Sequence, residues 1–249
     1  MTTAPVEDQR RLLDVQALDT RVQQLQHKRT TLPALARLVE IDSQLADLHT
    51  ALVQSRTAAS DLRRELAKAE SDVEQVRARA TRDQTRLDSG AVGAKDAQAL
   101  MSELESLTRR QGVLEEVELD VMERLEAHED TLAKLDEAHQ KVLEAKTEAE
   151  AERDAGYAEI DRELNTVQGE RASLAEGLDA GLVAAYDKLR SQLGGLGAAA
   201  LRGRRCEGCR LELNPTDLQA IRAAAPDEVV RCEECGRILV RPVETAAAE

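Results

Sequence analysis

A seven-residue repeat of apolar side chains runs through roughly the first two thirds of this 249-residue chain. Over residues 38–80 the apolar residues alternate at spacings of three and four, and Ser55 interrupts the pattern. A strict repeat held over this length is typical of the seam of a coiled coil. Residues 15–32 show the same spacing in a shifted phase, and the phase changes at Pro33. Because proline removes a backbone donor and clashes with the preceding turn, we expect a kink there.

The second half of the chain repeats the apolar pattern over residues 100–142 and, more sparsely, as far as Val167. The segment "RLDSGAVGAKDAQAL" separates the two runs, and its Gly90 and Gly93 are residues that end helices easily. A short connection makes two long amphipathic helices antiparallel neighbours. The sequence therefore predicts a long helical hairpin.

The breaks in the two apolar stripes fall opposite each other in such a hairpin. If the turn centres near Val92, Ser55 faces His128. We interpret both as polar seam residues that fix the register, with metal binding or pH sensing by the histidine as the alternative.

The composition agrees with a narrow helical bundle. The chain has no Phe and no Trp, and its only tyrosines are Tyr157 and Tyr186, whereas aromatic side chains usually dominate a thick core. The net charge of −14 argues against binding of the whole molecule to nucleic acid or to an anionic membrane. No segment resembles a signal peptide and no apolar run could span a bilayer, so we expect a cytoplasmic protein with no membrane segment.

All four cysteines lie in one short window as two CxxC pairs: Cys206, Cys209, Cys232 and Cys235. Two residues between cysteines let one tight turn present both sulfurs to a metal, and four thiolates suit tetrahedral zinc. Because four thiolates leave no position for water, the pattern predicts one structural Zn²⁺. The alternative is a redox dithiol pair, which normally starts a helix in a βαβ fold that this sequence does not suggest.

The residues between the cysteine pairs predict a zinc ribbon with an inserted helix. Asn214, Pro215 and Asp217 have the order of a helix start: a capping residue, a proline and an acid. We expect short strands in "LEL", "EVVRC" and "GRILVRP", and a further strand in "LGAAALRGRRC". Each CxxC turn is here called a knuckle. Gly208 and Gly236 fit positions in the two knuckles that need a positive φ.

Eight arginines and seven acidic residues lie in residues 198–242. The arginines either balance the −2 charge of a zinc with four thiolates or contact phosphate or an acidic protein. No aromatic platform for base stacking is present, which weakens the case for nucleic acid. The candidate contacts are Arg202, Arg204, Arg205, Arg210 and Arg237.

Three segments resemble one family: "LDSGAVGAKDAQALMSELESLTRRQGVLEEVELDVMERLE", "AAYDKLRSQLGG" and "CEECGRIL". They are similar to bacterial coiled-coil hairpin proteins with a C-terminal four-cysteine (C4-type) zinc ribbon. The resemblance implies a hairpin joined to the ribbon by a short helix, and no established enzymatic activity. Some members of the family resemble adaptors or chaperones for sigma factors or secretion components, and nucleic-acid binding has been suggested. The Ala, Arg and Asp content is typical of a high-GC bacterium such as an actinobacterium.

Together these observations predict a mainly α protein: a long kinked antiparallel coiled-coil hairpin with a small C-terminal zinc ribbon of short β-strands plus one helix. The predicted parts are a hairpin over residues 1–178 (arms about 5–86 and 96–178, tip 87–95), a connecting helix over 179–195, a zinc ribbon over 196–243 and a disordered tail over 244–249. We expect a non-enzymatic adaptor or chaperone-like protein that binds a protein partner, as a monomer or weak dimer. The alternative is an RNA- or DNA-binding protein that acts through the arginine-rich ribbon.

Overall fold

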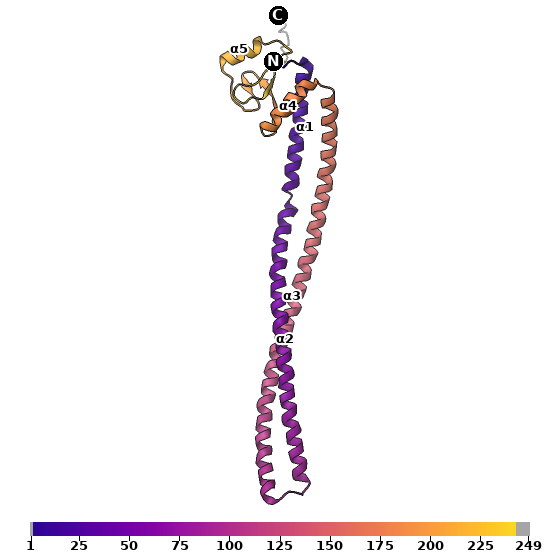
Figure 1. Ribbon diagram of the computed structural model, residues 1–249, viewed down its shortest axis with the longest axis vertical. Helices are drawn as coiled ribbons and strands as arrows, with labels where there is room; N and C mark the ends of the chain where they lie inside the picture. Colours follow the sequence, from indigo (N-terminus) through magenta and orange to yellow (C-terminus); the bar gives the residue numbers. More distant parts are fainter. Residues whose placement is uncertain (1, 243–249) are drawn as a thin grey trace. The chain divides into compact units, whose positions relative to one another are not determined.

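The structure is a computed structural model that describes residues 2–242, so the predicted tail lies outside the described residues. Within this range the chain is mainly helical, with a small sheet near its C-terminal end, as predicted (Figure 1). The helices are α1 (Val6–Thr30), α2 (Pro33–Asp88), α3 (Ala94–Glu176), α4 (Ala180–Gln192) and α5 (Pro215–Ala223). The strands are β1 (Ala198–Arg202), β2 (Arg205–Cys206) and β3 (Ile238–Val240).

The chain divides into two compact units. Unit 1 combines Met1–Leu35 with Ala151–Glu249, and unit 2 is Ala36–Glu150. Unit 1 therefore holds the ends of both helical arms together with α4 and the ribbon, whereas the sequence suggested a boundary between hairpin and ribbon. The predicted parts follow chain order, while the compact units follow contacts between distant segments.

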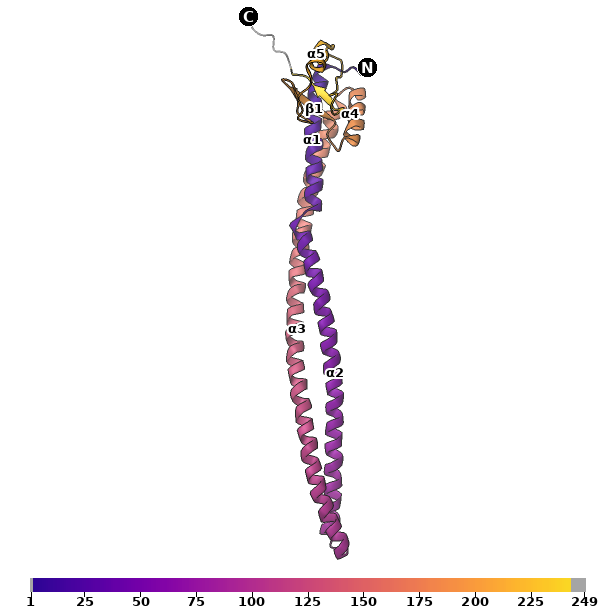
Figure 2. The ribbon, with the colours of Figure 1, turned by 90° about the vertical axis from the view of Figure 1, so that its left-hand side faces the viewer.

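Unit 2 is an antiparallel pair of helices, formed by most of α2 and the first half of α3 (Figures 1 and 2). The tip lies between Asp88 and Ala94, and Gly90 there has a φ of 68°. Apolar seam residues from both helices pack together at the end of the unit away from the tip: Leu38, Ile41, Leu45, Val142, Ala145 and Ala149. The predicted hairpin is confirmed.

Ion pairs flank the seam of unit 2 on its exposed sides. Arg56 contacts Asp136 at 2.9 Å, and Lys146 contacts Asp42 at 2.7 Å. Exposed pairs of this kind contribute little stability, so the apolar seam is the main source of it. Ser55 is buried in this seam, and its hydroxyl has no hydrogen-bond partner among the described residues.

The helical arm breaks completely before Pro33, where the sequence predicted a kink. Helix α1 ends at Thr30, and the Thr31 amide donates to His27 O at 3.0 Å. Helix α2 then begins at Pro33. The residue before a proline disfavours the helical region, so Leu32 cannot continue α1, whereas Pro33 is well suited to a first helical position.

The main core of unit 1 is assembled from segments far apart in sequence. Helices α1 and α4 contribute Leu12, Val15, Leu182 and Tyr186, and the strands contribute Ala198 and Ile238, all at most 1% exposed. The sheet order is β2–β1–β3: β1 pairs with β2 in antiparallel and with β3 in parallel orientation.

The first residues of the chain pair with the ribbon. The Ala4 amide donates to Asp227 O at 2.8 Å, and the Val229 amide donates to Thr2 O at 3.0 Å. The buried Gln9 side chain donates to Ala4 O at 2.9 Å and to Pro226 O at 3.3 Å. Residues 2–9 and 226–229 therefore form one structure, which the sequence did not predict.

Candidate metal centre

The four cysteine sulfurs converge, all within 4.8 Å of one another. The Cys206 and Cys235 Sγ atoms lie 4.0 Å apart, and those of Cys209 and Cys232 lie 3.9 Å apart. A tetrahedral zinc with Zn–S bonds of about 2.3 Å requires S···S distances of about 3.8 Å. The donor set and its spacing therefore fit one zinc ion held by these four cysteines, with the coordination shell filled.

The two knuckles have the same backbone path. The Arg210 amide donates to Cys206 O at 2.8 Å, and the Gly236 amide donates to Cys232 O at 2.7 Å. Each donor directly follows the second cysteine of its pair and has a positive φ, 62° for Arg210 and 72° for Gly236. Arg210 is the one described non-glycine residue with a positive φ. Each knuckle therefore needs a residue in the left-handed backbone conformation directly after its second cysteine.

Gly208 serves a different purpose from the one the sequence suggested. It does not have the positive φ expected for it. A Cβ atom at this position would lie 2.8 Å from Arg237 Cδ and 3.0 Å from Ala199 Cβ. Gly208 is thus required for close packing, and the positive φ in this knuckle falls on Arg210 instead.

The thiols differ in acidity before a metal binds. Burial raises the pKa of Cys206, and it raises the pKa of Cys232 to about 12. Burial also acts on Cys235, but hydrogen bonds from the backbone and side chain of Arg237 outweigh it and lower the pKa of that thiol to about 7. Zinc must displace protons from the more basic thiols, so metal binding releases protons.

An apolar cluster supports the cysteines from the ribbon side. Buried residues of the strands, of α5 and of the loop before it surround Cys206 and Cys232: Ala199, Leu201, Leu213, Leu218, Ile221 and Leu239. Helix α5 starts as predicted, because Asn214 Oδ1 accepts the Asp217 amide at 2.8 Å. This core is small, so the metal is needed to hold it together.

The five candidate arginines have different surroundings. Arg202, Arg204, Arg205 and Arg210 are exposed and form no ion pair among the residues described. Arg237 is half-buried, and its guanidinium donates to Leu196 O at 2.9 Å and to Leu193 O at 3.3 Å. Arg237 therefore ties the metal centre to the segment after α4, which leaves four arginines free on the ribbon surface.

Arg241 is a structural residue that sequence reasoning missed. Its guanidinium donates to five backbone carbonyls at 2.7–3.3 Å, at the C-terminal end of α5 and in the loop after it: those of residues 221, 224, 225, 226 and 228. A basic residue near a helix C-terminus commonly satisfies its last carbonyls. No local sequence signal indicates this role, because Arg241 lies far from α5 in sequence.

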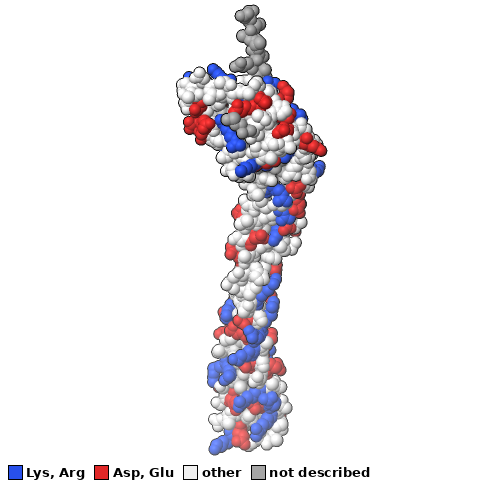
Figure 3. Space-filling model, turned by 45° about the horizontal axis from the view of Figure 1, so that its top comes forward, with Lys and Arg blue, Asp and Glu red and all other residues white. Residues whose placement is uncertain are grey.

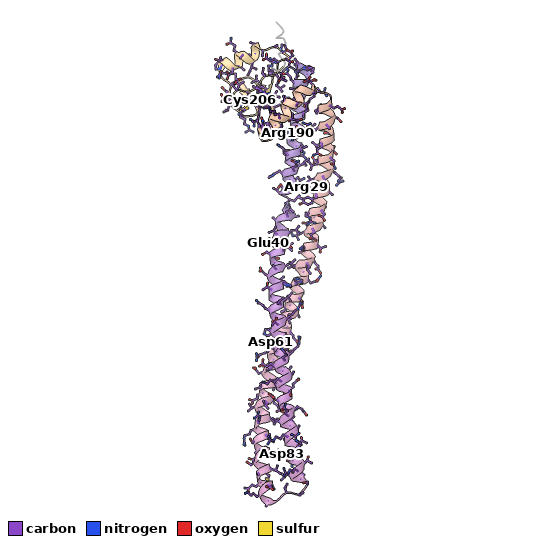
Figure 4. All side chains as sticks on the ribbon, in the orientation of Figure 1. Arg29, Glu40, Asp61, Asp83, Arg190 and Cys206 are labelled. Carbon is purple, nitrogen blue, oxygen red and sulfur yellow. The ribbon has the colours of Figure 1, made fainter. Side chains whose placement is uncertain are left out.

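A buried polar cluster anchors α4 to α1. Asp19 of α1 is 3% exposed and accepts the Tyr186 hydroxyl at 2.8 Å. Arg171 Nε and Arg190 Nη2 lie 3.3 and 3.4 Å from the other oxygen of Asp19, and Arg171 also pairs with Asp187. Figure 4 shows Arg190 and Cys206 within unit 1. Burial and then the bond to Asp19 raise the pKa of Tyr186.

A second buried contact joins α1 to the segment that leads into β1. The Gln16 side chain accepts the Gly197 amide at 2.7 Å and donates to Gly195 O at 3.1 Å. Gly195 has a φ of 96°, and a Cβ atom there would collide with the Gln23 side chain. The segment "AAYDKLRSQLGG" therefore carries the residues that join α4 and the start of the ribbon to α1. Asp19 and Gln16 were missed because polar residues on a helix are normally solvent-exposed.

The fold and the metal centre define the class: an antiparallel coiled-coil hairpin that carries a C4-type zinc ribbon with one structural zinc. Residues 15–194 match the CT398-like coiled coil hairpin domain, and residues 205–239 match the C4-type zinc ribbon domain. The chain belongs to the CT398-like coiled-coil hairpin family.

Similar proteins occur in mycobacteria and beyond. Rv2229c of Mycobacterium tuberculosis is 37% identical over 238 residues, which cover 96% of this chain and 97% of that protein. A solved Mycobacterium smegmatis structure is 37% identical with a TM-score of 0.87, covering 96% of this chain and all of that one. CT398 from Chlamydia trachomatis has the same fold at 22% identity, with a TM-score of 0.70 over 95% of this chain and 98% of that one. No helix in residues 2–242 is long and apolar enough to cross a membrane.

Proposed function

We propose that the protein is a non-enzymatic adaptor that binds a protein partner along the hairpin of unit 2. The observation that carries this proposal is a pair of exposed apolar side chains on α3, Leu119 and Met122, here called the α3 apolar surface. They are 58% and 46% exposed and lie three residues apart, so they share one side of the helix, whereas the exposed Val113 and Val117 lie on another side. Exposed apolar groups that lie together on one side of a helix can mark a surface that another protein covers.

On the face of the helical arms visible in Figure 3, charges of both signs are interspersed. Apolar contacts with a partner helix that lies along α3 are therefore a better basis for specificity than contacts with these mixed charges.

The partner surface can be tested by site-specific photo-crosslinking in the native host. A benzophenone amino acid at Leu119 should crosslink one partner, and Met122→Gln, on the same side of α3, should reduce that product. The matched control is Glu123→Gln with Glu126→Gln, which changes two exposed residues of the same helix. Equal crosslinking in Met122→Gln and in this control variant would refute the proposed surface.

A second candidate function, nucleic-acid binding, rests on the four exposed arginines of the ribbon. They lie within nine residues, and none has an ion pair among the described residues. Phosphate contacts lose affinity steeply with salt, so binding of RNA or DNA should be measured at two salt concentrations. Arg202→Glu, Arg204→Glu and Arg205→Glu together should abolish that salt dependence, whereas Arg231→Glu on the same ribbon should reduce it by less than half. No detectable binding at low salt would eliminate this function.

We also infer a cytoplasmic location and a monomer or weak dimer. A zinc centre with four thiolates suits a compartment in which thiols stay reduced. The seam of unit 2 is already satisfied within one chain, so no second copy is needed to cover it. Light scattering of the zinc-loaded protein should give the monomer mass at micromolar concentration. A stable dimer at nanomolar concentration would contradict this inference.

A further inference from the structure

Unit 1 contains a cavity that the metal centre does not use. Its volume is about 430 Å³, and it lies between the start of α1, the ends of β1 and β3 and the C-terminal end of α5. Val6, Leu201, Ile221 and Val240 supply apolar walls, and none of the four cysteines lines it. This volume is at the small end of the range for sites that bind small molecules.

The charged residues that line this cavity within residues 2–242 are cationic. They are Arg10, Arg222 and Arg241, and no Asp or Glu of this range lines it. Backbone carbonyls occupy both terminal nitrogens of Arg241, but they do not neutralise its charge. Arg222 and Arg241 therefore bring positive charge to the cavity, in a protein whose net charge is −14, whereas Arg10 pairs with Glu7.

Arg10 and Arg222 have unused donors. Arg10 Nη1 binds Glu7 Oε1 at 2.8 Å, but Arg10 Nε is buried and has no partner. Arg222 makes no hydrogen bond or ion pair among the described residues. A buried donor without an acceptor is costly, and a carboxylate is the acceptor that matches two guanidinium groups best.

We propose that this cavity binds a small organic anion, with a carboxylate at Arg10 and Arg222 and a short apolar body against the four apolar walls. This site is independent of the partner surface on α3. The ligand is a free organic acid.

The probe is hexanoate, titrated by calorimetry into the zinc-loaded full chain. Hexanamide, the neutral isostere, should bind at least about ten-fold more weakly, which corresponds to about 1.4 kcal/mol. Arg10→Gln and Arg222→Gln should each weaken hexanoate binding by a similar factor. Arg205→Gln, an exposed ribbon arginine outside the cavity, should change it less than two-fold.

Amide chemical shifts locate the binding. The amides of Gly203 and Ile221 should move with hexanoate, while those of unit 2 should not. Absence of hexanoate binding at 10 mM, or equal affinity for hexanamide, would overturn the proposal. Affinity unchanged by both arginine substitutions would overturn it as well.

Discussion

The bond between Tyr186 and Asp19 should be worth about 2 kcal/mol to unit 1. Tyr186 is fully buried and donates to a carboxylate that is 3% exposed, at 2.8 Å. Hydrogen bonds to charged groups contribute about 1.5–3 kcal/mol. Arg171 and Arg190 still neutralise Asp19 in Tyr186→Phe, so the loss should stay near the middle of that range.

The effect of Tyr186→Phe should depend on pH in a defined direction. The folded-state pKa of Tyr186 is raised above its ordinary value of 10.0. Above pH 10 the unfolded chain therefore loses this proton while the folded chain keeps it, and stability falls by about 1.4 kcal/mol per pH unit. The Phe variant lacks this loss, so the difference between the two proteins should shrink as pH rises above 10.

The measurement is urea unfolding followed by circular dichroism at pH 7.5 and at pH 11. Both tyrosines lie in unit 1 and the chain has no Trp, so tyrosine fluorescence at pH 7.5 identifies the transition of that unit. Tyr157→Phe is the control, because Tyr157 packs its ring against Arg29 and its hydroxyl has no hydrogen bond among the described residues. A change below 0.5 kcal/mol for Tyr186→Phe, or a difference constant with pH, would refute the reasoning.

Three further predictions concern the zinc, the knuckles and the seam. Removing zinc with a chelator should raise amide hydrogen exchange in residues 2–15, which pair and pack with the ribbon, and leave residues 36–150 protected; unchanged exchange at residues 2–15 would contradict the shared core. Because both positions have a positive φ, Gly236→Ala should destabilise the ribbon by about 1–2 kcal/mol, whereas Arg210→Gly should be neutral or stabilising by up to about 1 kcal/mol. The measurement is thermal unfolding, and a loss of stability in both variants would contradict this prediction. Ser55→Ala should stabilise unit 2 by about 1–2 kcal/mol more than Ser60→Ala, because it removes a buried hydroxyl without a partner; an equal effect of the two, by circular dichroism, would show that the hydroxyl is satisfied.

The features that the sequence predicted correctly are those with a local signature. The heptad repeat predicts the hairpin because side chains three and four residues apart share one helix face. Cysteine spacing predicts the ribbon, since one tight turn sets the positions of two sulfurs. The start of α5 at Asn214 follows from capping in the same way.

The features that were missed depend on contacts between distant segments. The burial of Asp19 requires Tyr186 and Arg190 of α4, more than 160 residues away along the chain. The pairing of β1 with β3 and of residues 2–4 with the loop near Asp227 is equally non-local. Amino-acid type also gave wrong expectations of exposure, because aspartate and arginine are usually exposed. For this reason Arg237 was expected to contact a partner, whereas its guanidinium binds Leu196 O within the chain.

The discontinuous sequence of unit 1 sets an order of events during synthesis. Residues 1–35 leave the ribosome before their partners, which lie in residues 151–249. At about 5–20 residues per second, the apolar face of α1 waits about 10 s or more for those partners. Residues 36–150 are synthesised earlier, and their two helices can pair progressively from the tip. This pairing shortens the loop that must close between the two parts of unit 1. Formation of the unit 2 hairpin can therefore precede the assembly of unit 1 and lower the entropy cost of bringing residues 1–35 to the ribbon residues that are translated later.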